Sequence, residues 1–137
     1  MDHLHLVYDD EILKLFWDTQ TRYHLAEWHG DVKGDKLRTA AYACVNASRT
    51  RPAKLWLADA THVGMLDGGD QTWMVDDFYP RLARNGVQHV AFVVPEKTLV
   101  HIPVKRMNKA YGDRGTLEFQ YHSTREAAMA WLATLNR

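Results

Sequence analysis

The chain has 137 residues, 46% of them hydrophobic and 25% charged, a composition that favours a single domain over residues 1–137. Basic and acidic residues both number 17, so we expect no general attraction to nucleic acid. The lone cysteine, Cys44, excludes an internal disulfide, and no apolar run approaches the roughly 18 residues of a membrane-spanning helix. Because the N-terminal segment is acidic and lacks the apolar centre of a signal peptide, we expect a cytoplasmic protein.

The first part of the chain predicts an antiparallel meander. Apolar residues alternate with polar ones over Leu4–Tyr8 and Tyr23–Trp28, and less strictly over Ile12–Trp17, with short turns between these strands. From Asp35 to about Arg49 the apolar spacing becomes helical. The apolar run Lys54–Asp59 then indicates the next strand.

The rest of the chain alternates between helices and strands. The expected segments are a helix over Asp70–Asn85, a strand over Val87–Val94, a helix from Pro103 to Tyr111, a strand over Leu117–Tyr121 and a final helix with a Ser123–Glu126 capping box. Helices between consecutive strands require parallel crossovers. We therefore predict an α/β domain with a mixed sheet, in which the strands Lys54–Asp59 and Val87–Val94 lie parallel, as neighbours.

Several sequence segments carry a resemblance to a known family. They are WHGDV at Trp28–Val32, KLWLAD at Lys54–Asp59, a helix with Trp73 and FYP at Phe78–Pro80, GVQHVAFVVP at Gly86–Pro95 and AMAWL at Ala128–Leu132. Together with the order of elements, they resemble the small bacterial STAS-like proteins, which are similar in fold to anti-sigma-factor antagonists. The resemblance implies a STAS-like fold and a regulatory, non-enzymatic role in which the domain binds a protein partner.

The same resemblance points to a missing phosphorylation site. Phosphorylated antagonists carry an aspartate followed by a serine or threonine before the helix after the central strand, and the phosphate on that hydroxyl breaks the partner interface. Here Asp67 is followed by Gly68, which has no oxygen to phosphorylate. Thr61 and Thr72 are the nearby hydroxyls that remain as alternatives.

The segment after the strand Lys54–Asp59 is the candidate functional surface, because loops at the carboxyl ends of strands gather ligands and partners. We predict a loop over Thr61–Asp70 and an adjoining helix through Tyr79. The candidate residues are Asp59, Thr61, His62, Asp67, Gly68, Asp70, Trp73 and Tyr79. The acidic residues and His62 allow a cation site or acid–base chemistry, but turn and cap roles are the commoner use of such aspartates, with Asp70 the expected helix cap. We therefore predict no metal, cofactor or catalytic residue.

Two further features leave alternatives open. Five tryptophans on five different elements fit either a Trp-rich core or an aromatic pocket for a small apolar ligand or lipid. Pro80 interrupts the helix Asp70–Asn85, so we expect either a kink near Asp76–Pro80 or two shorter helices. A carrier or sensor of an apolar ligand is thus the alternative to the interaction module, and a homo-oligomer is compatible with either.

Overall fold

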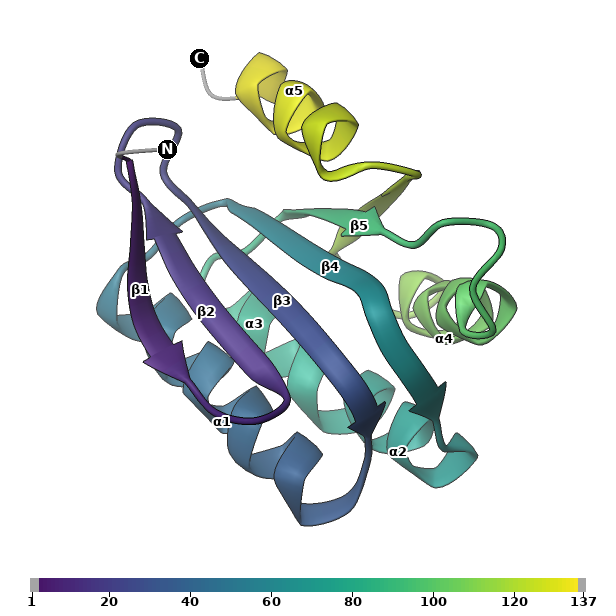
Figure 1. Cartoon of the computed structure of the whole chain (residues 1–137). Helices are drawn as coiled ribbons and strands as arrows, with labels where there is room; N and C mark the ends of the chain where they lie inside the picture. Colours follow the sequence, from purple (N-terminus) through teal and green to yellow (C-terminus); the bar gives the residue numbers. More distant parts are fainter. Residues whose placement is uncertain (1–2, 136–137) are drawn as a thin grey trace.

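The computed structural model describes residues 3–135, in which a six-stranded mixed sheet has helices on both faces (Figure 1). In chain order the elements are β1 (Leu4–Asp9), β2 (Leu13–Asp18), β3 (Tyr23–Val32), α1 (Gly34–Thr50), β4 (Leu55–Leu66), α2 (Gly68–Trp73), the π-helix η1 (Met74–Phe78), α3 (Tyr79–Arg84), β5 (His89–Val93), α4 (His101–Gly112), β6 (Glu118–His122) and α5 (Arg125–Leu135).

The strands lie in the sheet in the same order as in the chain, from β1 to β6. Strands β1, β2 and β3 pair antiparallel, and β3 to β6 pair parallel. Leu57 of β4 lies opposite Ala91 of β5 in a parallel register. The expected α/β architecture is therefore confirmed, as is the predicted parallel pairing of these two strands.

The sheet has two unequally covered faces. Helices α1, α2–η1–α3 and α4 cover what we call the wide face, whereas α5 alone lies on the other, the α5 face (Figure 1). Side chains alternate between them, so that Trp56 belongs to the core under the wide face and Leu57 to the core under α5. The strict period of two in β4 thus supplies apolar residues to two cores at once.

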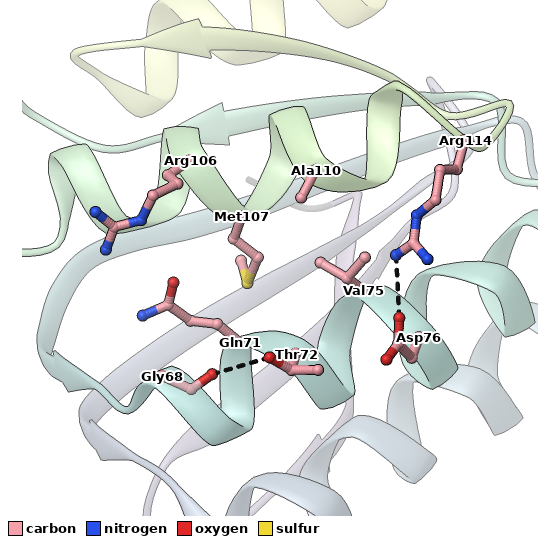
Figure 2. A pocket seen from close by; sticks show the side chains of 9 residues that line it. All are labelled: Gly68, Gln71, Thr72, Val75, Asp76, Arg106, Met107, Ala110 and Arg114. Atoms are coloured by element: carbon pink, nitrogen blue, oxygen red, sulfur yellow. Dashed lines mark hydrogen bonds and ion pairs between the residues drawn. The ribbon is translucent and has the colours of Figure 1, made fainter.

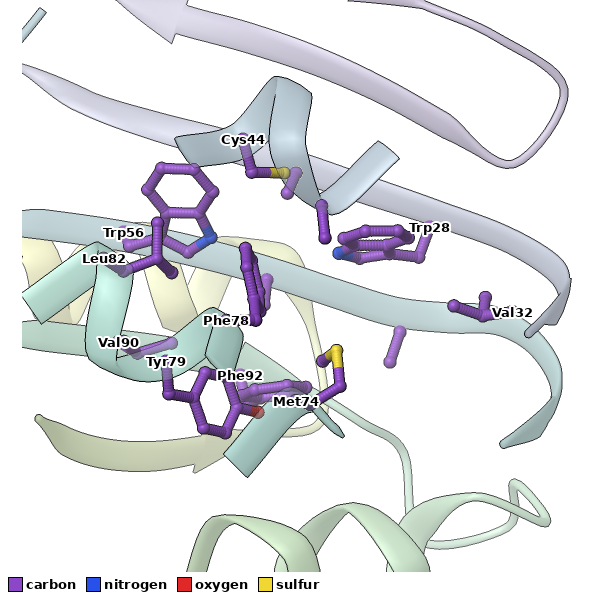
Figure 3. Packing of buried hydrophobic residues seen from close by; sticks show 14 of the residues in the cluster. Trp28, Val32, Cys44, Trp56, Met74, Phe78, Tyr79, Leu82, Val90 and Phe92 are labelled. Carbon is purple, nitrogen blue, oxygen red and sulfur yellow. The ribbon is translucent and has the colours of Figure 1, made fainter. Parts of the chain in front are cut away.

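The core under the wide face is the larger one, and Figure 3 shows Trp28, Trp56, Phe78 and Phe92 meeting within it. Trp17 is also buried, while Trp73 and Trp131 are only partly covered. Cys44 is fully buried, and this burial raises the pKa of its thiol. It fills space as a small hydrophobic side chain.

Strand β4 is longer than the sequence predicted, and this corrects the expected loop. Residues 61–66 continue the strand, so a loop over Thr61–Asp70 is wrong for most of its length. The reason is β3, which itself extends to Val32 and offers pairing partners as far as Leu66. An irregularity between Glu27 and His29 shifts the register, and His62 of β4 then lies opposite His29.

The predicted helix Asp70–Asn85 begins at Gly68 and contains a π turn. The amide of Tyr79 donates to the carbonyl of Met74, five residues earlier. Pro80 follows in the first turn of α3, where the missing amide hydrogen costs least. The expectation of shorter helices is thus confirmed. They are joined by the π turn, which the hydrophobic periodicity did not indicate.

The last helix is capped by a different residue from the one expected. Helix α5 begins at Arg125, so Thr124 holds the cap position and its hydroxyl accepts the amide of Ala127 at 3.2 Å. The predicted Ser123 cap is therefore wrong by one residue. None of the helices within residues 3–135 combines the length and hydrophobicity that a bilayer crossing requires.

Candidate functional site

The sheet separates the predicted site residues into three places. Asp59, Thr61 and His62 belong to a polar cluster on the α5 face. Asp67 caps α2, and Gly68, Asp70 and Trp73 belong to that helix, on the opposite side of the sheet. Tyr79 is inside the wide-face core. The prediction of one continuous surface is therefore wrong, because β4 continues to Leu66 with the first three candidate residues on its α5 face, while the helices that follow pack on the other face of the sheet.

The polar cluster on the α5 face is organised by Arg125, and we call it the Arg125 cluster. The Arg125 guanidinium donates to Asp59 Oδ2 at 2.8 and 3.1 Å and also to Glu27 Oε2. Asp59 accepts the Thr61 hydroxyl at 2.6 Å through its other oxygen. Glu27 also binds His29 Nε2 at 2.8 Å, and the His29 ring stacks on His62 with centroids 5.4 Å apart.

Arg125 and the carboxylates of this cluster stabilise one another in their charged forms. Burial alone would raise the pKa of Glu27, but the hydrogen bonds from Arg125 and His29 outweigh it and hold that pKa below its ordinary value. Burial alone would lower the pKa of Arg125, but its bonds to Glu27 and Asp59 raise it. The cluster therefore attaches the first turn of α5 to β3 and β4. Residues 3–135 contain no group of three metal-ligating side chains placed to hold an ion.

The helix cap that the sequence analysis expected at Asp70 is instead Asp67. Asp67 caps α2, with its Oδ1 accepting the amide of Gly69 at 3.1 Å. Asp70 is buried, accepts the amide of Gly34 at 3.0 Å and pairs with Arg38 Nη1 at 2.8 Å. The expected Asp70 cap is wrong because the helix begins two residues earlier, which turns Asp70 inward towards α1.

Trp73 and Tyr79 both serve packing between elements. The Arg38 guanidinium lies 4.8 Å from the Trp73 ring centroid, and Tyr42 of α1 meets the same ring edge-on. Tyr79 is buried, and its hydroxyl donates to Asn108 Oδ1 of α4 at 2.5 Å. Burial raises the pKa of Tyr79 well above its ordinary value. Its expected place on an interaction surface is therefore wrong.

A groove between α2–η1 and α4 borders the predicted surface at Gly68 (Figure 2). It is open to solvent, has a volume of about 370 Å³, and is lined by Gly68, Gln71, Thr72, Val75, Asp76, Arg106, Met107, Ala110 and Arg114. We call it the α2–α4 groove. Val75, Met107 and Ala110 supply its apolar part, and polar side chains border it on both helices.

Two arginines border this groove, one within α4 and one just after its C-terminal end. Arg114 Nη2 lies 3.0 Å from Asp76 Oδ1 across the opening, an exposed pair of small energetic value. Arg106 is exposed and forms no ion pair with any residue from 3 to 135. Neither arginine is among the site residues predicted from the sequence. Their spacing with Ile102 and Ala110, every four residues, nevertheless indicates one side of a helix.

A second, smaller cavity bears on the apolar-ligand alternative. It lies between the sheet and the helices, and its lining is apolar, with Trp28, Met74, Phe92, Val104 and Met107 among the residues that surround it. Its volume is only about 40 Å³, whereas sites for drug-sized ligands measure roughly 300–1,000 Å³. A lipid would require α4 to move away from the sheet.

Comparison with known proteins adds no relative: no family model matches the chain, and no curated protein is significantly similar to it.

Proposed function

We propose that this protein is a non-catalytic interaction module, similar in role to the anti-sigma-factor antagonists, which binds a protein partner through the α2–α4 groove. The observation that carries the proposal is the pairing of an apolar groove floor with an arginine, Arg106, that has no ion pair within the described residues. Arginine beside an apolar contact is typical of the side chains that dominate protein interfaces.

The residues that line the groove indicate the chemistry of the partner segment. Val75, Met107 and Ala110 offer a floor for one or two apolar side chains, and Arg106 and Arg114 are placed to bind carboxylates beside them. The partner segment therefore carries acidic residues next to an apolar anchor. The Arg114–Asp76 pair opens at small cost when a carboxylate of the partner replaces Asp76, because both side chains are exposed.

The module acts without the phosphorylation switch of the phosphorylated anti-sigma-factor antagonists. Gly68 has no hydroxyl, and the two nearby hydroxyls are engaged within the domain: Thr61 donates to Asp59 Oδ1 at 2.6 Å and Thr72 to the Gly68 carbonyl at 3.3 Å. Intact-mass and peptide-mapping analysis of protein from the native host should show no phosphate at either threonine. Substantial phosphate at Thr61 or Thr72 would restore the phosphorylated-antagonist mechanism.

The test of the groove is site-specific photo-crosslinking in the native host. A benzophenone amino acid replaces Thr72 or Ala110, which line the groove from opposite sides and are exposed, and Lys14 on β2 serves as the exposed control. We expect the same partner from both groove positions and none from Lys14. The double variant Arg106→Glu/Arg114→Glu should lose that product. Identical products from Lys14, or none from the groove positions, would overturn the proposal.

A carrier of a small apolar ligand is the weaker candidate, since the cavity behind α4 holds only about 40 Å³. Native mass spectrometry of the purified protein distinguishes the two functions. The interaction module should have the mass of its chain alone, and a stoichiometric apolar adduct would favour the carrier.

A further inference from the structure

Two apolar side chains protrude where β5 leads into α4. Leu99 is 86% exposed and Ile102 is 69% exposed, the two highest values among the large hydrophobic residues described as exposed. They are three positions apart: Leu99 belongs to the connection that leaves β5 (Figure 1), and Ile102 to the first turn of α4. We call this pair the apolar tip. Neither side chain contributes to either core.

Basic residues predominate in the segment that carries the apolar tip. Between residues 96 and 109 the chain has four cations, Lys97, Lys105, Arg106 and Lys109, and one carboxylate, Glu96, which gives a formal charge of +3 in a chain whose net charge is zero. All five of these side chains are exposed. The segment that carries the two protruding hydrophobic residues is therefore positively charged, although the net charge of the whole chain is zero.

We propose that the apolar tip docks on an anionic lipid surface, with Leu99 and Ile102 entering the boundary between head groups and acyl chains and the neighbouring lysines binding lipid phosphates. A bilayer accepts protruding side chains without a preformed pocket, and its anionic head groups complement the surrounding positive charge. A protein partner for the tip would instead need a cavity shaped to both side chains. The binding is peripheral and reversible, because only two apolar side chains enter the membrane.

Vesicle co-sedimentation tests this inference. The wild-type protein should pellet with phosphatidylcholine vesicles that contain phosphatidylglycerol, and hardly at all with phosphatidylcholine alone or at high salt. Leu99→Ser/Ile102→Ser should weaken this binding by at least about tenfold. The matched control is Met65→Ser, which removes another exposed apolar side chain, at the end of β4. Both variants change side chains outside the cores, so their melting temperatures should equal that of the wild type.

Charge reversal separates electrostatic attraction from apolar insertion. Lys97→Glu/Lys105→Glu should abolish binding to the anionic vesicles, whereas Lys14→Glu/Lys54→Glu, an identical change in net charge at two other exposed lysines, should retain it. Binding that survives Leu99→Ser/Ile102→Ser but not Lys97→Glu/Lys105→Glu would overturn the insertion of the tip.

A fluorescent label reports insertion directly. Because Cys44 is fully buried, a thiol-reactive environment-sensitive dye will label Leu99→Cys or Met65→Cys selectively. We expect a blue shift with anionic vesicles for the dye at position 99 and none at position 65. Absence of vesicle binding by the wild type would overturn the proposal. It would also be overturned if the wild type self-associates instead and a change at the tip removes that self-association, which would assign the tip to a protein contact. The groove crosslinking can succeed or fail independently of this result.

Discussion

Asp70 is one of the few buried charged residues, and its partners lie on α1 rather than on its own helix. Asp70→Ala removes the bonds to Gly34 and Arg38, and we expect the free energy of unfolding to fall by about 1.5–3 kcal/mol, the range for hydrogen bonds to a charged group. Asp67→Ala should lower it by about 0.5–2 kcal/mol, as the loss of a helix cap. Urea unfolding of both variants measures these changes, and a larger loss for Asp67→Ala would contradict the assigned roles.

His24 introduces a pH dependence that no sequence motif indicates. Its ring is buried between Trp17 and Trp56, and Nε2 donates to the Arg51 carbonyl at 2.9 Å. Nδ1 is buried without a partner in the described structure, so a proton there would find no acceptor. Burial accordingly lowers the pKa of His24 below its ordinary value of 6.5.

The sign of the effect follows from this lowered pKa. The unfolded chain takes up the proton first, so the stability that His24 contributes is complete above pH 6.5 and is lost as the pH falls through the folded-state pKa. We expect the melting temperature to fall over that range, with a shallower slope in His24→Phe. His5→Gln, which changes an exposed ring that forms no ion pair within residues 3–135, serves as the control. Equal slopes in all three proteins would rule out His24 as the source.

At the scale of elements, a single buried bond connects the helix that follows β4 to α4. Tyr79 of α3 donates to Asn108 Oδ1, while Asn108 Nδ2 is buried with no partner in residues 3–135. The second half of the long helix is thereby held against α4, the same helix that supplies Arg106 to the groove.

Removing one partner of this hydrogen bond should lower the free energy of unfolding more than removing both partners. Tyr79→Phe leaves the Asn108 carboxamide unpaired, and we expect a loss of about 1–3 kcal/mol in the free energy of unfolding. Tyr79→Phe/Asn108→Leu replaces both polar groups by apolar ones of similar shape and should recover most of that loss. Denaturant unfolding of the single and double variants completes the comparison. Additive losses would show that the two residues do not depend on each other.

At the scale of the whole molecule, the two cores share the strands that separate them. Adjacent residues of β4, such as Trp56 and Leu57, point into opposite cores, so neither core can form without the sheet. We expect one cooperative unfolding transition, with circular dichroism and tryptophan fluorescence giving coincident curves.

Core variants on the two faces should shift that transition together. Leu82→Ala under the wide face and Leu132→Ala on α5 both truncate fully buried side chains, and each should lower the free energy of unfolding by about 2–5 kcal/mol. A separate early transition in Leu132→Ala alone would show instead that α5 unfolds independently of the sheet.

The sequence by itself determined the type and order of the elements, because hydrophobic periodicity is a local property of the chain. Alternation over Tyr23–Trp28 and helical spacing after Asp35 each depend on a few consecutive side chains, and parallel neighbours follow from the helix between β4 and β5. The burial of Cys44 followed from its apolar helical neighbours in the same way.

Only the tertiary structure decided which of those residues meet. The length of β4 depends on pairing with β3, and the register shift near Glu27 sets which face His62 occupies. Arg125 lies 98 residues from Glu27 in the chain, yet the two side chains bond across the sheet. Such contacts depend on the distances between folded elements, for which spacing along the chain carries no signal. The predicted site therefore divided between two faces, and the groove became visible only with α4 in place.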